Sequence, residues 1–269
     1  MIFSSPHSGT GFPNPYGDRL LLNPLQIRSS EDAFVDELFG AAPDHGSPLI
    51  SARLSRAWVD LNRAPGELDP ALIEGAPKGF VNSRVAAGLG VIPRVVSEGR
   101  PIISGKISMD DAVGRVVGVW QPYHRQLQSL IDEARGKHGR AILFDCHSMP
   151  DDALSSTTSV FGRKPDVVLG DRFGVACGRW LVEAATAIFS REGFRVAKNA
   201  PFAGGYITQN YGRPRRGVHA LQIEINRSLY MHEALVQKSR DFDAIRARLT
   251  RAVGELTRLG ASPTQVAAE

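Results

Sequence analysis

The sequence predicts an α/β fold, a three-layer sandwich with a central mixed, mostly parallel sheet and helices on both faces. Residues 141–145, Ala-Ile-Leu-Phe-Asp, form a continuous apolar run of the kind expected for a strand buried on both faces. Segments of strand character alternate along the chain with segments of helical periodicity. Signals for tight hairpins are few, which also favours an α/β sandwich.

The amino-terminal third combines short strands, one capped helix and a long irregular region. Short apolar runs predict strands at residues 1–5, 48–54 and 57–61. The sequence Ser-Ser-Glu-Asp at 29–32 is typical of a capped helix start, so Asp32 is expected in the first helical turn. Residues 64–90 are expected to form loop and short helix, and loops of this length are often functional.

The rest of the chain alternates between helices and strands. Further strands are predicted at 91–96, 141–145, 194–197 and 219–225. Helices are predicted at 110–137, 171–190 and 242–259. The first of these helices is expected to be interrupted or rephased near Gln121-Pro122. His147 follows the strand at 141–145, at the end of the strand where α/β folds gather ligands.

Composition predicts one soluble globular domain over residues 1–260, followed by a disordered tail at 261–269. The chain has 269 residues, of which 42% are hydrophobic and 22% charged, enough for an ample core. No run approaches the roughly 20 apolar residues that a membrane span needs, and no signal-peptide pattern opens the sequence. We therefore expect a cytoplasmic protein.

Charge and cysteine content exclude several classes of protein. The 32 basic and 28 acidic residues give a formal charge of +4, which is too slight to indicate nucleic-acid binding but compatible with a small anionic substrate. Cys146 and Cys177 are the only cysteines. They allow neither a disulfide framework nor a multi-cysteine zinc site.

Four polar positions are difficult to explain by packing: His7, Asp32, His147 and Glu224. A catalytic zinc ion typically has three protein ligands of the histidine and carboxylate type and keeps one position for water. His7, Asp32 and His147 supply that number and those atoms. Glu224 is the candidate general base, because a carboxylate outside the ligand set can take the proton of an activated water. Together the four residues predict a metal site with its base.

Each of these residues also has a structural interpretation. A histidine at a strand end is usually a structural or surface residue. Asp32 alone is explained by the helix dipole, and Glu224 alone by the exposed face of a strand. Asp36, one helical turn after Asp32, competes for the role of acidic ligand. The prediction of a metal site therefore depends on the whole set.

Further positions support the prediction, each with a simpler alternative. Asn62-Arg63 places an amide beside a guanidinium that suits a carboxylate, although a structural salt bridge explains it equally well. The glycine pair before Tyr206 offers backbone N–H groups for a ligand, or forms a plain turn. His124 and His219 could support a metal ligand by hydrogen bonding or serve packing alone. Three arginines either attract an anionic substrate or lie in a solvated loop: Arg213, Arg215 and Arg216.

These residues and motifs resemble those of a known family, the N-formylglutamate amidohydrolases, also called N-formylglutamate deformylases. The resemblance runs in order from near the first residue to about Met231. It rests on the following segments: Ser-Pro-His-Ser-Gly at His7, Glu-Asp-Ala-Phe-Val-Asp-Glu-Leu-Phe at Asp32, Val-Asp-Leu-Asn-Arg at Arg63, Phe-Asp-Cys-His-Ser at His147, Gly-Gly-Tyr-Ile-Thr at Tyr206, Tyr-Gly-Arg-Pro at Arg213 and Gly-Val-His-Ala-Leu-Gln-Ile-Glu-Ile-Asn at Glu224.

The family looks like a branch of the zinc carboxypeptidase and cell-wall amidase group of α/β folds. The resemblance implies one zinc ion held by His7, Asp32 and His147, with Glu224 as general base. In the cell-wall amidase pattern the acidic ligand comes from the helix after the first histidine loop, which favours Asp32. In the carboxypeptidase pattern an acid stands three residues after the first histidine, and here that position is Thr10.

The resemblance further implies an enzyme of histidine degradation that converts N-formyl-L-glutamate and water into formate and L-glutamate. Its substrate would be a small anionic N-acyl amino acid, with no nucleic acid or membrane as partner. The implied substrate-binding residues are Asn62, Arg63, Arg84, Arg94, Tyr206, Arg213 and Arg216. Two alternatives stay open: a hydrolase of another N-acyl amino acid or cell-wall amide, and a non-catalytic binder of acidic amino acid derivatives. The sequence does not define the oligomeric state.

Overall fold

The computed structural model describes residues 1–260 except 78, 80–81, 156–159 and 161. Its strands are β1 (Ile2–Ser5), β2 (Leu49–Ser51), β3 (Ala141–Met149), β4 (Val167–Gly170), β5 (Val196–Lys198), β6 (Val218–Asn226), β7 (Met231–His232) and β8 (Gln237–Lys238). Its α-helices are α1 (Pro24–Arg28), α2 (Val35–Leu38), α3 (Ser83–Ala86), α4 (Met109–Arg115), α5 (Gln121–His138), α6 (Arg179–Arg191), α7 (Tyr206–Tyr211) and α8 (Phe242–Arg258).

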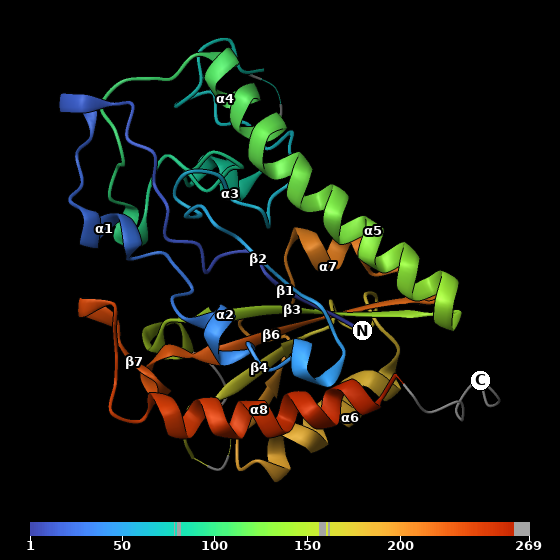
Figure 1. Ribbon diagram of the computed structural model, residues 1–269. Coiled ribbons are helices and arrows are strands. Elements are labelled where there is room, and N and C mark those ends of the chain that lie inside the picture. Colours follow the sequence, from blue (N-terminus) through green and yellow to red (C-terminus); the bar gives the residue numbers. More distant parts are fainter. Residues whose placement is uncertain (78, 80–81, 156–159, 161, 261–269) are drawn as a thin grey trace.

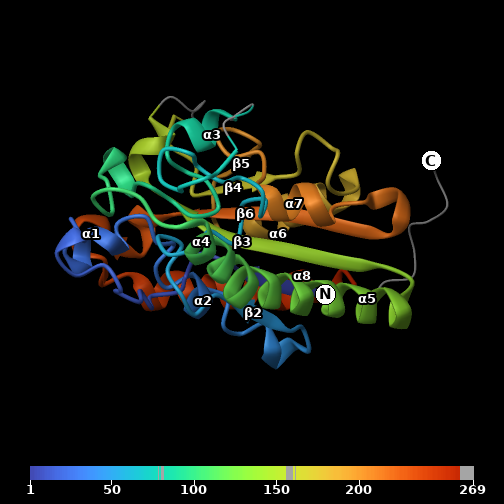
Figure 2. The same cartoon turned by 90° about the horizontal axis from the view of Figure 1, so that it is seen from above.

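The main sheet is mixed and mostly parallel, as predicted. Its strand order is β2-β1-β3-β6-β4-β5, and every neighbouring pair is parallel except β6 and β4. The two longest strands, β3 and β6, run side by side through the middle of the molecule (Figure 2). Strands β7 and β8 form a separate antiparallel pair.

Helices cover both faces of the sheet and give the predicted three layers (Figure 1). On one face, Ile142, Phe144 and Cys146 of β3 pack into the core shared with α2, α6 and α8. On the other face, Ala141 and Leu143 pack into the core shared with α5 and α7. Successive side chains alternate between the two faces because the strand is pleated. Both faces are buried, so the sequence of the strand is apolar at consecutive positions.

The long helix is rephased close to the predicted position. A π-helical turn, Val116–Trp120, joins α4 directly to α5. It ends one residue before Gln121, near which the sequence predicts the break. A π turn holds one more residue than an α turn, so the buried stripe of α5 is shifted relative to that of α4.

Two segments that were predicted as strands are irregular in the structure. Residues 57–61 form a turn, and within 91–96 the backbone makes only an isolated bridge from Val95 to Pro101. Apolar side chains of both segments are nevertheless buried: Ala57, Trp58, Val59, Leu61, Val91, Ile92, Val95 and Val96. The apolar pattern therefore predicted burial correctly and strand pairing wrongly.

Two helix predictions also need correction. Helix α2 begins at Val35, so Asp32 precedes the helix instead of lying in its first turn. The helix predicted from residue 171 begins only at Arg179. Arg172 and Phe173 have φ values of 55° and 57°, a left-handed backbone that an α-helix cannot contain.

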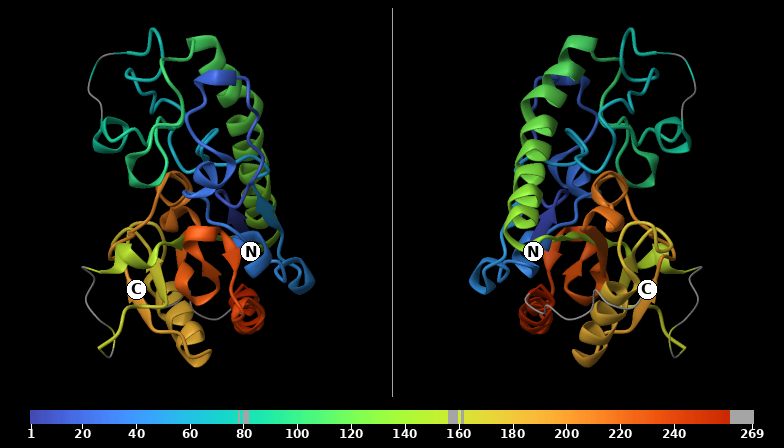
Figure 3. Two further views of the ribbon diagram at one scale, coloured as in Figure 1. Left: turned by 90° about the vertical axis from the view of Figure 1, so that its left-hand side faces the viewer. Right: turned by 90° about the vertical axis from the view of Figure 1, so that its right-hand side faces the viewer.

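The irregular region lies apart from the carboxyl-terminal helix. In both views of Figure 3, the described part of residues 60–105 stands at the opposite end of the molecule from α8. None of the helices in the described ranges is both long and apolar enough to cross a membrane. The tail predicted at 261–269 lies outside the described residues, and the single domain over 1–260 stays a prediction.

Candidate active site

The register of the two central strands brings four polar side chains together. Strands β3 and β6 pair in parallel, with Asp145 beside Gln222 and His147 beside Glu224. All four side chains lie on the face that carries α5 and α7, because they continue the alternation set by Leu143. The buried Ile223 and Ile225 point to the opposite face, so Glu224 is separated from both, as the sequence predicts.

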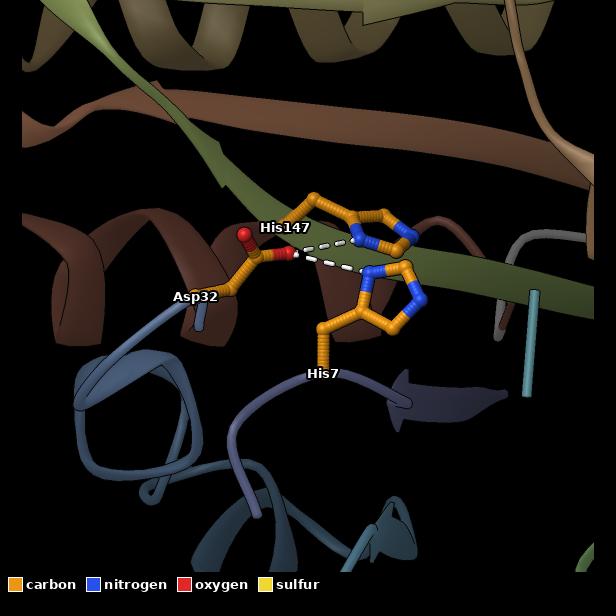
Figure 4. Close-up of side chains that lie close together, drawn as sticks. All are labelled: His7, Asp32 and His147. Atoms are coloured by element: carbon orange, nitrogen blue, oxygen red, sulfur yellow. Dashed lines mark hydrogen bonds and ion pairs between the residues drawn. The ribbon is translucent and has the colours of Figure 1, made fainter. Parts of the chain in front are cut away.

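Two loops bring His7 and Asp32 to His147. His7 follows β1, Asp32 precedes α2, and the backbone N–H of Asp32 donates to the carbonyl of His7 at 3.1 Å. The Oδ2 atom of Asp32 lies 2.9 Å from Nδ1 of His147 and 3.3 Å from Nδ1 of His7 (Figure 4). Each residue is at most 3% exposed. The three ligand atoms lie within 4.8 Å of one another and form the metal-ligand cluster identified in the described part of the chain.

Carboxylates hold the outer ring nitrogens of both histidines. Nε2 of His7 lies 2.7 Å from Oδ1 of Asp60, and Nε2 of His147 lies 3.1 Å from Oδ2 of Asp145. Each carboxylate accepts a hydrogen bond from the N–H at Nε2, which leaves Nδ1 of each ring directed toward Asp32. Arg227 fixes the other oxygen of Asp32, with a guanidinium nitrogen 2.9 Å from Oδ1.

The protonation states follow from these contacts. Burial opposes the ionisation of Asp32, but the hydrogen bond with His147 and the close contact with His7 outweigh it and hold the pKa of the carboxyl well below its usual range. Burial works against a charged His147, yet Asp145 and Asp32 raise the pKa of the ring well above its usual value. Burial raises the pKa of Glu224 to about 8, although the charge of His147 opposes this shift.

The donor set fits a divalent cation. Nδ1 of His7 is buried, and within the described residues it has no hydrogen-bond partner, since the Asp32 contact fails hydrogen-bond geometry. Two imidazoles and one carboxylate are a typical ligand set for catalytic zinc. The carboxylates behind both rings are the support that such ligands usually have.

Glu224 is held in place by its neighbour on the same face of β6. The side-chain amide of Gln222 donates to Oε1 of Glu224 at 2.9 Å, and its carbonyl accepts from the backbone N–H of Gly205 at 2.9 Å. Only 7% of Glu224 is exposed. One carboxylate oxygen of Glu224 is therefore fixed, and the side chain opens onto the same cavity as the His7, Asp32 and His147 group.

A cavity of about 630 Å³ contains this group and several arginines. Four arginines contribute to its lining: Arg56, Arg63, Arg84 and Arg227. Arg56 is bound to Asp60, with 2.8 Å between a guanidinium nitrogen and Oδ2. Arg63 bonds only carbonyl oxygens, those of Leu89 and Asn62, at 2.9 and 3.0 Å. Within the described residues, no carboxylate forms an ion pair with Arg63.

The predicted Asn62 lies at the centre of the site. Its amide nitrogen is 3.1 Å from Nε2 of His147 and 3.3 Å from Oδ2 of Asp145. Its side-chain oxygen accepts from the backbone N–H of Ile207 at 2.7 Å. The amide nitrogen donates to Asp145, the carboxylate behind His147, so Asn62 supports a metal-site histidine through Asp145 in addition to lining the cavity.

The other sequence-predicted residues lie outside the described cavity lining. Arg94 pairs with Asp69 at 2.8 Å, and Tyr206 packs against the rings of Trp120 and His124. His124 is buried in that aromatic group. Three more lie at the amino end of β6, about 20 Å along the strand from Glu224: Arg213, Arg216 and His219. Of the two competing acidic residues, the metal-ligand cluster contains Asp32 and does not contain Asp36.

Sequence reasoning missed five residues of the site: Arg56, Asp60, Asp145, Gln222 and Arg227. Asp145 and Gln222 stand two residues before His147 and Glu224, so strand alternation would have found them. Asp60 lies within the Val-Asp-Leu-Asn-Arg segment, in which the sequence-predicted site residues are Asn62 and Arg63. For Arg56 and Arg227 the sequence carries no signal that we recognise.

Comparisons with known proteins agree on one family. Residues 1–231 match the family model described as N-formylglutamate amidohydrolase. The chain is 31% identical over 257 residues to N-formylglutamate deformylase of Pseudomonas aeruginosa, covering 94% of this chain and 89% of that protein. It is 30% identical over 237 residues to N-formylglutamate deformylase of Pseudomonas putida, covering 87% and 82%.

Solved structures show the same relationship. The crystal structure of N-formylglutamate amidohydrolase from Ralstonia eutropha JMP134 matches with a TM-score of 0.89 at 31% identity, over 97% of this chain and 93% of that one. A protein from Agrobacterium tumefaciens matches with a TM-score of 0.64 at 18% identity, over 97% and 91%, and shows the fold alone. The fold, together with these matches, defines an α/β amidohydrolase. The chain belongs to the N-formylglutamate amidohydrolase family.

Proposed function

We propose that this chain hydrolyses N-formyl-L-glutamate to formate and L-glutamate and that the reaction depends on a divalent metal ion, most simply zinc. The observation that carries the proposal is the buried group of His7, Asp32 and His147 beside Glu224, in a cavity that arginines also line. The names of the relatives support the substrate. The donor set supports the metal.

His7, Asp32 and His147 would hold the ion. When bound, a zinc ion in such a site acts as a Lewis acid toward the substrate carbonyl and toward water. The protein supplies the orientation of the ligands: Asp60 and Asp145 fix the two rings, and their contacts direct both Nδ1 atoms toward Asp32.

Glu224 moves the proton. It takes a proton from the attacking water and delivers it to the amide nitrogen as the C–N bond breaks, so that formate and the amine leave. Burial raises the pKa of Glu224 to about 8, and a cation beside it favours the ionised form that a base requires. Gln222 holds one oxygen of Glu224, which leaves the other free to face the water.

Arg63 is the proposed anchor for a substrate carboxylate. Burial lowers the pKa of its guanidinium, and the nearby charges of Arg56 and Arg84 add to this effect against the pull of Asp60. A buried guanidinium without an acidic ion-pair partner destabilises the folded protein, and binding of an anion in the cavity offsets this cost. A dicarboxylate such as N-formylglutamate supplies that anion.

The experiment measures formate and L-glutamate released from N-formyl-L-glutamate. We expect the two products in equal amounts. Arg63→Met is expected to raise KM by about 10-fold to 100-fold, as expected for the loss of a hydrogen bond to a charged group. Arg53→Met, which changes an exposed arginine outside the cavity lining, is the matched control. Binding of the compound without any release would instead favour a non-catalytic binder.

A further inference from the structure

The irregular segment from Asp60 to Arg63 supplies three groups to the site. Asp60 holds His7, Asn62 contacts His147, and Arg63 lines the cavity. None of these four residues belongs to a helix or a strand. Side chains on a segment without a backbone ladder are placed well only if other contacts hold the backbone. The positions of these three groups therefore depend on the contacts that hold the backbone of residues 60–63.

Two side chains from the long helix bind the carbonyls on either side of Asn62. The indole N–H of Trp120 donates to the carbonyl of Arg63 at 2.9 Å. Nε2 of His124 lies 2.9 Å from the carbonyl of Leu61. A carbonyl only accepts, so this nitrogen of His124 carries the proton and donates. The donors reach across 57 and 63 positions of sequence.

The two donor rings are themselves held rigidly. The rings of Trp120 and His124 pack against each other at a tilt of 30°, with their centroids 3.9 Å apart. Nδ1 of His124 lies 2.8 Å from the hydroxyl of Tyr211, which can donate to it. Burial lowers the pKa of His124 to about 4, so near neutral pH the ring is neutral and has one donor and one acceptor. Both of its nitrogens then have suitable partners.

The π-helical turn sets which way these rings face. Before it, α4 buries Ala112 and Arg115. After it, the buried positions are those that follow Trp120 in α5: Tyr123, His124, Leu127 and Ile131. One residue more or less turns a helix by about 100°. A plain α-helix through this region would therefore rotate Trp120 and His124 away from Leu61 and Arg63 if α4 kept its packing.

We propose that the π-helical turn Val116–Trp120 is a positioning device for substrate binding, which acts by directing Trp120 and His124 onto the carbonyls that flank Asn62. Trp120 and His124 are positioning residues, because neither lines the described cavity. The proposal rests on the proposed function in one respect, the role of Arg63 as the carboxylate anchor. Its structural part, the clamp on residues 60–63, is independent of the substrate.

The first test removes one donor and keeps an aromatic ring. Trp120→Phe is expected to raise KM for N-formyl-L-glutamate about 10-fold, with kcat within about 3-fold of wild type and unchanged metal content, because a buried carbonyl loses its partner. Trp180→Phe, a matched change in α6, should leave all three values unchanged. Hydrogen exchange of a peptide that covers residues 60–64 should accelerate in Trp120→Phe alone.

The second test changes the helical phase. Inserting one alanine after Val117, which is half-exposed within the π turn, turns α5 by about 100° relative to α4 and should raise KM at least as much as Trp120→Phe does. Deleting Val117 removes the extra residue of the π turn, keeps the two buried faces in phase and should leave KM close to the wild-type value. Val117→Ala keeps the chain length and should leave KM at the wild-type value.

The outcomes of these tests distinguish failure of the positioning role from failure of the proposed function. If Trp120→Phe leaves both KM and the exchange of residues 60–64 unchanged, or if kcat and metal content fall together with the rise in KM, the positioning role is overturned. If the wild type releases no formate from N-formyl-L-glutamate, the proposed function fails. The exchange experiment still decides whether Trp120 clamps the segment, because it needs no substrate.

Discussion

The cavity has two walls that are built in different ways. On the strand wall, Asp145, His147, Gln222 and Glu224 project from β3 and β6 at adjacent register positions. Their spacing is set by backbone hydrogen bonds and by the pleat, which hardly depend on distant side chains. On the loop wall, the segment from Asp60 to Arg63 has no ladder and depends on donors from the long helix.

In the proposed function the two walls have different roles: the strand wall carries out the reaction, and the loop wall binds the substrate. The strand wall carries a metal ligand and the base. A small displacement of either group lowers the reaction rate strongly. The loop wall carries Arg63, the proposed carboxylate anchor. Variants of the strand wall should therefore affect turnover or metal content. Variants of the loop wall should mainly affect substrate binding, except at Asp60, which also holds His7.

The largest effect is expected from His147→Ala on the strand wall. The change removes a proposed ligand, and the buried carboxylates of Asp32 and Asp145 each lose one ion-pair partner. Purified protein should contain no stoichiometric metal by elemental analysis, and formate release should fall to background. His138→Ala, an exposed position at the end of α5, is the control. A full metal complement in His147→Ala would remove this residue from the ligand set.

Glu224→Gln should separate turnover from metal binding. The amide keeps the shape of the side chain but cannot accept the proton of the attacking water. We expect kcat to fall by about 10²-fold to 10⁴-fold, with the metal content of the wild type. Glu183→Gln on the exposed surface of α6 should change neither value. Turnover close to that of the wild type would eliminate Glu224 as the base.

The two walls can be compared directly through the metal affinity and KM of two variants, Asp145→Asn and Asp60→Asn. Each removes the carboxylate behind one proposed histidine ligand, Asp145 behind His147 and Asp60 behind His7. Metal affinity, measured by competition with a chelator, should fall by about 10-fold to 100-fold in each variant. Asp60→Asn should also raise KM, because Arg56 loses its ion pair on the loop wall. Unchanged affinity in both variants would contradict the supporting role of the carboxylates.

The smallest effect concerns stability against pH. Burial lowers the pKa of His124 from 6.5 to about 4 in the folded protein, so only the unfolded chain takes up a proton between these values. Tyr211, Tyr206, Tyr123 and Asp145 are the titratable groups around the ring. Stability should therefore decrease as pH falls from 6.5 toward 4, by up to about 3 kcal/mol, with no contribution from His124 above that range.

Urea unfolding of metal-free protein at pH 7.5 and pH 5 measures this effect. His124→Gln lacks the titrating ring, so its loss of stability between the two pH values should be smaller than that of the wild type. An identical loss in both proteins would show that His124 does not contribute to the pH dependence.

The strand wall could be predicted from the sequence to a large extent. The apolar run at 141–145 indicated a central strand, and β6 was predicted with nearly its observed bounds. His147, predicted to follow the strand at 141–145, lies inside β3, which continues to Met149, and Glu224 lies two residues before the end of β6. Parallel register could not be predicted, because it depends on which strands are neighbours.

The loop wall could not be predicted in the same way. Residues 57–61 have the apolar pattern of a strand, but the carbonyl of Leu61 binds His124 and that of the nearby Arg63 binds Trp120, and both donors lie far along the sequence. The same holds for Asp32, which is brought to His7 by a backbone hydrogen bond and not by a helix. Local patterns carry no information about such contacts.

The central claim is that the buried group of His7, Asp32 and His147 binds a metal ion that the hydrolysis of N-formyl-L-glutamate requires. The most direct measurement is elemental metal content of the purified protein, paired with formate release before chelation, after chelation and after zinc is restored. The account predicts about one metal ion per chain, loss of formate release on chelation and its recovery with zinc. Formate release that persists in fully metal-free protein would contradict it.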